Sequence, residues 1–305
     1  MDVKQRFTEI IGLDTYKRVD NIHVLDLYLG IDNMSRFSLL LVTPAKPTQM
    51  FSSKIICVQT GQRKDEQWAI LFSLINNEFE DLFCRFCEDI IESSRIIKDK
   101  KNGSEFVCSR YAKWQKMLSR NNSGLLSSSE IKGLIGELYF LKQYLLPKYG
   151  EDLAVNSWIG PELADQDFVC KDIWYEVKST VSGAESILIA SIEQLDTKND
   201  GELIIVYLDK TSNSDKSKIT LNGIYKEIYD MLTTDNLKQK LSEILLILGY
   251  YPRSEYDEFT FRYATMKRYV VTKEFPCIRR TMLPYSVVNT KYELAIPSIG
   301  NFLKE

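Results

Sequence analysis

The sequence predicts an α+β or α/β fold, in which an amino-terminal antiparallel β-rich domain with helices precedes a larger domain of mixed strands and helices. Short strand-like segments follow one another between residues 22 and 75, as is typical of antiparallel strands. Helical periodicity follows from residue 77 toward residue 147, and Leu203–Leu208 is an apolar run typical of a strand buried on both faces. A charged break at Lys98–Gly103 interrupts the helical region, so we expect domains at residues 1–100 and 101–305.

The composition is that of a globular protein without a membrane-spanning segment. Of 305 residues, 44% are hydrophobic and 27% charged, and the longest apolar runs are far shorter than the ~20 residues that cross a bilayer. No signal-peptide pattern follows the amino terminus, so we expect a cytoplasmic protein. The net charge of −3 indicates no global attraction to nucleic acid, but residues 259–291 hold seven basic residues and one acid. Any nucleic-acid contact would depend on such a local cluster.

The amino-terminal domain is predicted to hold four strands and a helix. Turn-forming residues such as Pro44–Pro47 and Gly61 separate the strand-like segments. Residues 77–94 carry apolar side chains at helical spacing. The predicted strands are 22–29, 37–42, 54–59 and 67–75.

The second domain is predicted to alternate helices and strands. Ser127 and Glu130 have the spacing of a capping box, so a helix should begin there and run toward Pro147. Residues 186–195 fit a strand, a helix or one of each, and 210–218 form a polar loop. The other predicted helices are 104–119, 221–232 and 236–248. The other predicted strands are 155–158, 166–170, 173–178, 203–208 and several within 259–296.

Glu176 and Lys178 are the first candidate functional pair. A strand at residues 173–178 places both charges on one face, with Tyr175 and Val177 on the other. An acid two positions before a lysine occurs at four other places in the chain, so the spacing alone predicts nothing. Two opposite charges on a strand face that should be apolar favour a functional site, with an exposed structural ion pair as the alternative.

Asp167 is the second candidate acid. It lies just before Phe168–Cys170, and a tight turn at Lys171–Asp172 would bring it within about 5 Å of Glu176 on the next strand. Two carboxylates this close repel each other unless a cation lies between them. Mg²⁺ prefers one or two carboxylates, a backbone carbonyl and waters, so the pattern predicts a divalent-metal site.

Glu137 is the third candidate acid. It flanks the apolar stripe of the helix that starts after Ser127, and this position allows it to reach the predicted metal site over the sheet edge. Gly133, one turn earlier on the same side, would let another segment approach closely.

The order of these residues resembles the PD-(D/E)XK nuclease superfamily: a helix glutamate, then an aspartate, a short hairpin and Glu-x-Lys. Several short motifs resemble the bacterial DUF4420 family within it, over about residues 125–296. The residue before Asp167 is Gln166, where the superfamily name has proline. The motifs are Gly-Leu-Ile-Gly-Glu-Leu at 133–138, Trp-Ile-Gly-Pro at 158–161, Gln-Asp-Phe at 166–168, Glu-Val-Lys-Ser-Thr at 176–180, Gln194–Leu195 and Phe275–Pro276.

The resemblance implies an αβββαβ restriction-endonuclease-like core and a metal-dependent DNA endonuclease that uses Mg²⁺ or Mn²⁺. It implies that Asp167 and Glu176 bind the metal with the carbonyl of Val177. Glu137 would be an outer or second-metal acid, and Lys178 would position or activate the attacking water.

The partners implied are double-stranded DNA, other subunits of a bacterial restriction or phage-defence system such as an ATPase or methyltransferase, and further copies of the chain. Two other functions remain open: a non-cleaving DNA- or partner-binding scaffold with a degenerate nuclease fold, and a nuclease of RNA. No nucleotide-binding loop motif is present. The candidate DNA-binding residues are Arg279, Arg280, Lys267, Arg268 and Gln194.

Overall fold

The structure is a computed structural model that describes residues 2–120, 125–160, 165–171, 173–197, 199–287 and 290–304, except for the side chains of residues 101, 119 and 120. These residues group into two compact units. The first unit runs to Leu125 and includes Leu246–Gly249, and the second contains Leu126–Leu245 and the chain from Tyr250 onward. The division falls after the helix that starts at Lys100, whereas the charged break predicts a boundary before it.

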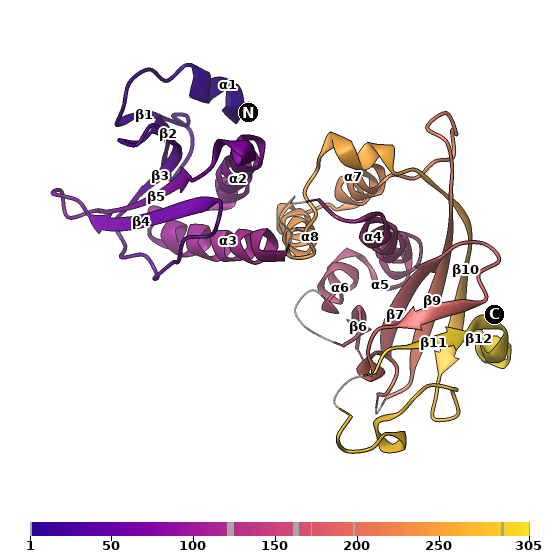
Figure 1. The fold of residues 1–305 in the computed structure, drawn as a ribbon. Helices are drawn as coiled ribbons and strands as arrows, with labels where there is room; N and C mark the ends of the chain where they lie inside the picture. The colour runs from indigo at the N-terminus through magenta and orange to yellow at the C-terminus, as the bar shows by residue number, and fades with distance from the viewer. Residues whose placement is uncertain are drawn as a thin grey trace. The chain divides into compact units, whose positions relative to one another are not determined.

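An antiparallel five-stranded sheet forms the first unit, with the strand order β1-β2-β3-β5-β4 (Figure 1). The four predicted strands correspond to β2–β5, and β1 is an additional short strand paired with β2. The strands are β1 (Thr15–Arg18), β2 (Asp26–Ile31), β3 (Phe37–Thr43), β4 (Ile56–Gln62) and β5 (Trp68–Leu74).

Three helices complete the first unit: α1 (Val3–Thr8), α2 (Glu80–Ser93) and α3 (Lys100–Arg120). Buried aromatic rings join two of them to the sheet. The ring of Phe72 on β5 lies 5.4 Å from that of Phe86 on α2 and 5.1 Å from that of Tyr111 on α3. Because α3 shares this core, it belongs to the first unit.

A mixed five-stranded sheet forms the second unit, with the order β12-β10-β9-β7-β6 (Figure 1). The β6–β7 and β9–β10 pairs are antiparallel, whereas β7 and β9 run parallel. Eight successive residues of β9 are buried, as the apolar run predicts for a central strand. The strands are β6 (Phe168–Cys170), β7 (Ile173–Thr180), β9 (Gly201–Lys210), β10 (Phe261–Val271) and β12 (Leu303–Lys304), with β8 (Ser186–Ile189) and β11 (Tyr292–Ala295) in a separate pair.

Helix α4 (Ser128–Phe140) starts as predicted, because Ser127 and Glu130 form both hydrogen bonds of the capping box. A π-helical turn at Leu141–Leu145 continues it toward Pro147, whose missing N–H interrupts the helical hydrogen bonds. The strand predicted at 155–158 is wrong for residues 155 and 156, which end α6, whereas Trp158 forms an isolated antiparallel bridge with Phe168. The remaining helices are α5 (Leu146–Tyr149), α6 (Glu151–Asn156), α7 (Leu221–Met231) and α8 (Asp235–Ile247), with 3₁₀ turns at Asn77–Phe79, Ser94–Ile96, Ile192–Gln194 (η5), Ser254–Glu258, Arg280–Met282 and Ile296–Phe302.

Helix α4 packs directly on β7, and Gly136 makes this possible. A Cβ atom at Gly136 would lie 1.9 Å from the Ser179 hydroxyl oxygen, so only glycine fits without a shift. Gly133 has open space around its Cα instead, so the close approach expected there occurs one turn later. Further along α4, the ring of Phe140 packs on that of Tyr175 at 5.2 Å.

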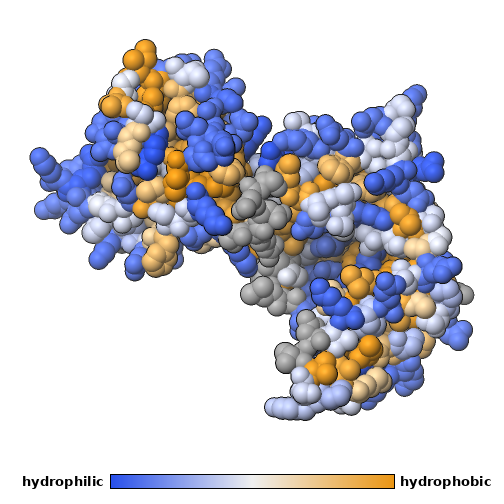
Figure 2. All heavy atoms as spheres, in the orientation of Figure 1, coloured by the Kyte–Doolittle hydropathy of each residue, from blue (hydrophilic) through white to orange (hydrophobic). Residues whose placement is uncertain are grey.

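The exposed surface is mostly hydrophilic on the face seen in Figure 2, where separate apolar groups interrupt it. Among the helices that the structure describes, none combines the length and the apolar character needed to cross a membrane.

Candidate functional site

Glu176 and Lys178 lie on one face of β7, as the alternation predicts. The Lys178 Nζ atom is 2.7 Å from Glu176 Oε1, and the two side chains are 17% and 1% exposed. Tyr175 and Val177 are buried with their side chains on the opposite face, where Tyr175 packs against α4. A buried ion pair is costly to maintain without further partners, so this one differs from an ordinary exposed strand pair.

Asp167 is brought to this pair by the β6–β7 hairpin. Phe168 pairs with Tyr175, and Asp167 therefore lies one step beyond, beside Glu176. The Val177 N–H donates to Asp167 Oδ2 at 2.8 Å. The Asp167 carbonyl accepts from the amides of Ile159 and Gly160 at 3.0 and 3.1 Å. The predicted turn residue Asp172 and the motif residue Pro161 lie outside the described residues.

Glu137 reaches the same region from α4. The Trp158 indole N–H donates to Glu137 Oε2 at 2.9 Å. Trp158 is fully buried and stacks on Phe168, with the ring centroids 5.4 Å apart. One carboxylate oxygen of Glu137 is therefore held in a fixed position by a rigid aromatic donor.

The pKa values show that the three carboxylates share one electrostatic environment. Burial and, after it, the neighbouring Asp167 raise the pKa of Glu176 to about 8, against the opposing effect of Lys178. Burial also raises the pKa of Glu137, with Asp167 and Glu176 adding to the effect. Burial raises the pKa of Asp167, although the Val177 N–H and Lys178 counteract it. Asp167 and Glu137 nevertheless keep some solvent exposure, as groups that receive a ligand must.

The donor set fits a divalent cation with oxygen ligands. In the described part of the chain, no three His, Cys, Asp or Glu side chains are already arranged as a metal-binding group. Mg²⁺, however, needs only one or two carboxylates besides a carbonyl and waters. Glu176 Oε2 is buried and has no hydrogen-bond partner among the described residues, which leaves an oxygen suited to a cation.

A comparison with protein-family models gives one match. Residues 9–297 match the model of DUF4420, described as "Putative PD-(D/E)XK family member". The chain belongs to the DUF4420 family. The match confirms the resemblance and extends it beyond residues 125–296, because it includes most of the first unit. The curated proteins and the solved structures gave no match.

Gln194 of this DUF4420 protein contacts the site directly. It lies on η5, and its Oε1 atom accepts hydrogen bonds from Lys178 Nζ at 3.1 Å and from the Ala190 N–H at 2.8 Å. Lys178 is therefore held between Glu176 and Gln194. This contact gives Gln194 a place beside the lysine, in addition to the DNA contact expected for it.

The other candidate DNA-binding residues of the DUF4420 chain lie on β10 and on the segment after it. Arg268 forms two hydrogen bonds, at 2.8 and 3.0 Å, with the buried Glu202. Lys267, by contrast, is exposed. Arg279 pairs with Asp196 at 3.3 Å, and the Arg280 N–H donates to the same carboxylate at 2.8 Å. Arg268 thus has a structural partner, while Asp196 anchors Arg279 and Arg280 two residues from Gln194.

Trp158 is the site residue that sequence reasoning did not assign a role. In the sequence it stands out only as part of the Trp-Ile-Gly-Pro motif, although a tryptophan N–H in an apolar core needs an acceptor. Its position 21 residues after Glu137 gives no hint of the contact, because α5 and α6 lie between them. Glu202 has no predicted role either, although a glutamate directly before the apolar run of β9 is a signal that a cation must pair with it.

Proposed function

We propose that this DUF4420 protein is a metal-dependent DNA endonuclease that hydrolyses phosphodiester bonds. The observation that carries the proposal is the convergence of Glu137, Asp167 and Glu176 beside Lys178, with raised carboxylate pKa values. Carboxylates whose pKa values are strongly shifted by burial and by a charged partner mark a candidate functional site.

We assign the αβββαβ core of the superfamily to elements of the second unit. In chain order, α4 is followed by β6, β7 and β9, then by α7 and α8, and finally by β10. The β8 strand pairs with β11 and lies outside this sheet. In this assignment the candidate residues belong to the first helix and to the first two strands of the core.

Asp167 and Glu176 would hold Mg²⁺ or Mn²⁺ together with the Val177 carbonyl, and Glu137 would act as an outer acid or as a ligand of a second ion. A bound divalent ion lowers the pKa of a coordinated water and neutralises charge on the phosphate. The Val177 N–H fixes one oxygen of Asp167, and the Trp158 indole fixes one oxygen of Glu137. The chain thus orients two of the three carboxylates before any ligand arrives.

Lys178 provides positive charge at the same point. Its ammonium group is held by Glu176 and Gln194, so its position is set by two contacts rather than by the flexible stem alone. In the proposed reaction it donates a hydrogen bond to the attacking water or to a phosphate oxygen, where negative charge develops in the transition state.

DNA would be bound by local positive charge, since the whole chain has a net charge of −3. The proposed contacts to the DNA phosphate backbone remain Lys267, Arg279 and Arg280. We also propose that the protein acts within a bacterial restriction or phage-defence system, as an oligomer or with other subunits, because the family resemblance implies this setting.

Plasmid cleavage in Mg²⁺ tests the proposal. We expect the wild-type protein to nick or linearise a supercoiled plasmid. Asp167→Asn and Lys178→Met should each lower the rate by at least about 100-fold, since each removes a group that stabilises developing charge. The matched control is Glu185→Gln, which removes an exposed acid of the same unit.

Equal rates for Asp167→Asn, Lys178→Met and the wild type would overturn the assignment of the site. A wild-type protein that binds DNA and Mg²⁺ without cleaving would instead identify the non-cleaving scaffold. Cleavage of RNA in preference to DNA would correct the substrate class.

A further inference from the structure

A pocket of about 190 Å³ lies beside the candidate site on the second unit. Its residues come from the β6–β7 hairpin and from the segment between η5 and β9. It is lined by Gln166, Val169, Lys171, Ile173, Trp174, Thr197 and Asn199.

The pocket and the candidate site share one face of β7. Trp174, Glu176 and Lys178 alternate along the strand, so their side chains point to the same side. Two residues of a strand span about 7 Å, a distance that one nucleotide covers. Gln166, which also lines the pocket, directly precedes Asp167. A strand of nucleic acid with its phosphate at Glu176 would therefore have a neighbouring base within reach of the pocket.

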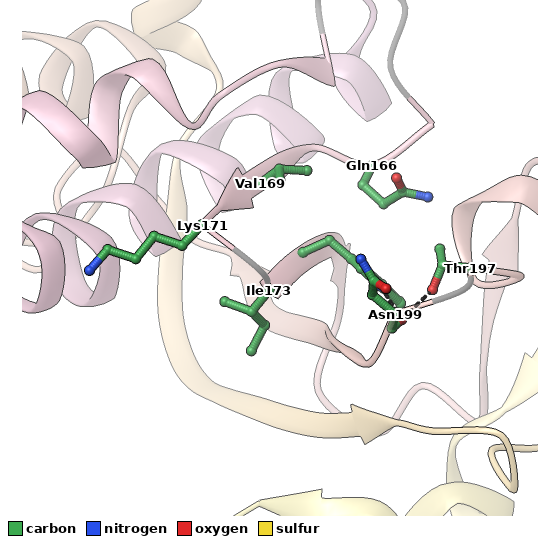
Figure 3. Close-up of a pocket in the computed structure, with 7 residues that line it drawn as sticks. Gln166, Val169, Lys171, Ile173, Thr197 and Asn199 are labelled. Atoms are coloured by element: carbon green, nitrogen blue, oxygen red, sulfur yellow. Dashed lines mark hydrogen bonds between the residues drawn. The ribbon is translucent and has the colours of Figure 1, made fainter.

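The lining combines an apolar wall with a polar edge. Val169, Ile173 and Trp174 supply apolar surface, and a Cβ atom at Gly201 would lie 2.1 Å from the Trp174 ring, which shows how closely this ring is fixed on the backbone. Figure 3 shows Gln166 and Thr197 on one side of the pocket, while Lys171 extends away from the other labelled side chains. The apolar wall suits the face of a flat ring, the polar side chains suit its polar edge, and Lys171 suits an adjoining anionic group.

Hydrogen-bonding groups on the polar edge are available to a ligand. Gln166 donates through Nε2 to the Glu193 carbonyl at 2.7 Å, which fixes the carboxamide, and its Oε1 accepts no hydrogen bond from the described residues. The Asn199 side chain is exposed and makes no hydrogen bond within the described part of the chain. Carboxamides recognise the edges of nucleobases, adenine above all.

The size of the pocket limits the ligand to one ring system. A cavity of about 150 Å³ holds benzene, whereas pockets for larger ligands start at about 300 Å³. A base that enters such a pocket must leave the base stack, which is easiest for an unpaired nucleotide. Asp196, next to Thr197, also anchors Arg279 and Arg280, so positive charge adjoins the same edge.

We propose that this pocket receives a single unpaired nucleobase of the strand whose phosphate lies at the candidate site. The inference rests on the proposed nuclease function and specifies its substrate as a strand with at least one unstacked base beside the bond to be cleaved.

The test measures binding of labelled single-stranded 12-mers by fluorescence anisotropy, in the Asp167→Asn background to prevent cleavage. A series of otherwise identical 12-mers carries one abasic position, moved along the strand. We expect one register in which the abasic position weakens binding about tenfold, the effect of losing one held base. Asn199→Ala should reduce the ratio of the affinities for the intact and the abasic 12-mer toward one. Asn213 is an exposed asparagine in the 210–218 loop, and Asn213→Ala should leave this ratio unchanged.

The pocket inference would be overturned if the affinity did not depend on the abasic position, or if this dependence were the same with and without Asn199→Ala in the Asp167→Asn protein. Plasmid cleavage by the wild type would still support the nuclease function in that case. A wild-type protein that neither cleaves plasmid nor binds any nucleic acid would overturn the proposed function itself, and the pocket inference with it.

Discussion

Glu176→Gln in the metal-free protein should abolish a specific loss of stability that the wild type shows as the pH rises from 6 to 8. The pKa of Glu176 is raised from 4.5 to about 8 by burial and by Asp167. Because the folded-state pKa lies above the unfolded-state value, the protonated carboxyl stabilises the fold fully below about pH 4.5, and this contribution is lost as the pH rises through about 8. At about 1.4 kcal/mol for each pH unit, Glu176 should lower the free energy of unfolding by about 2–3 kcal/mol between pH 6 and 8.

Glutamine keeps the shape of the side chain but cannot ionise, so the free-energy difference between variant and wild type should grow over this window. The pKa values of Asp167 and Glu137 are also raised, so these two groups should lower the stability of both proteins as the pH rises. Only the difference between the two proteins therefore isolates Glu176.

Urea unfolding at pH 6, 7 and 8 in EDTA provides the measurement. The chain has two compact units, and two-state unfolding holds for single domains, so each unit needs its own probe. Fluorotryptophan labels observed by ¹⁹F NMR report the first unit through Trp68 and Trp114 and the second through Trp158 and Trp174. A difference that stays constant across this pH range in the second unit would refute the raised pKa of Glu176.

Two further predictions concern the residues around the site. Arg268→Ala should destabilise the second unit by about 2–4 kcal/mol, because it leaves Glu202 buried with fewer partners. Lys267→Ala removes only the contact of an exposed ammonium group with the Tyr207 ring and should cost less than about 1 kcal/mol in chemical unfolding. Equal effects would show that Arg268 has no structural role. Gly133→Ala in open space should stabilise by about 1 kcal/mol, whereas Gly136→Ala should gain less or destabilise, because the Ser179 hydroxyl must rotate away and the Ser179 Cβ lies only 3.2 Å from the added methyl. Thermal melting of both variants checks this, and equal stabilisation by the two would contradict the close packing of α4 on β7.

The sequence was sufficient for elements whose signals are local. The Ser127 and Glu130 spacing predicts the start of α4, and both capping hydrogen bonds form. The alternation in 173–178 predicts that Glu176 and Lys178 share a strand face, and they form an ion pair there. The strand predicted at 155–158 is wrong in its first half because its apolar residues resemble a strand, although Glu151 and Asp152, just before it, are typical of a helical first turn.

Contacts between distant residues could not be read from local patterns. Arg268 pairs with Glu202, which lies 66 residues earlier in the sequence, and Arg279 pairs with Asp196, 83 residues earlier. Both pairs exist because β10 and the following segment return to the sheet beside β9 and η5. Such contacts decide whether a basic residue is available to DNA, so the sequence predicts a basic segment better than it predicts which of its members reach a phosphate.

Direct binding of Mn²⁺ tests the central claim, that the carboxylates around Glu176 form a divalent-metal site. Isothermal titration calorimetry at pH 8 should detect a Mn²⁺ site in the wild type and in Glu185→Gln. In Glu176→Gln the affinity should fall by at least about tenfold. Absence of Mn²⁺ binding by the wild type, or equal affinity in all three proteins, would contradict the claim.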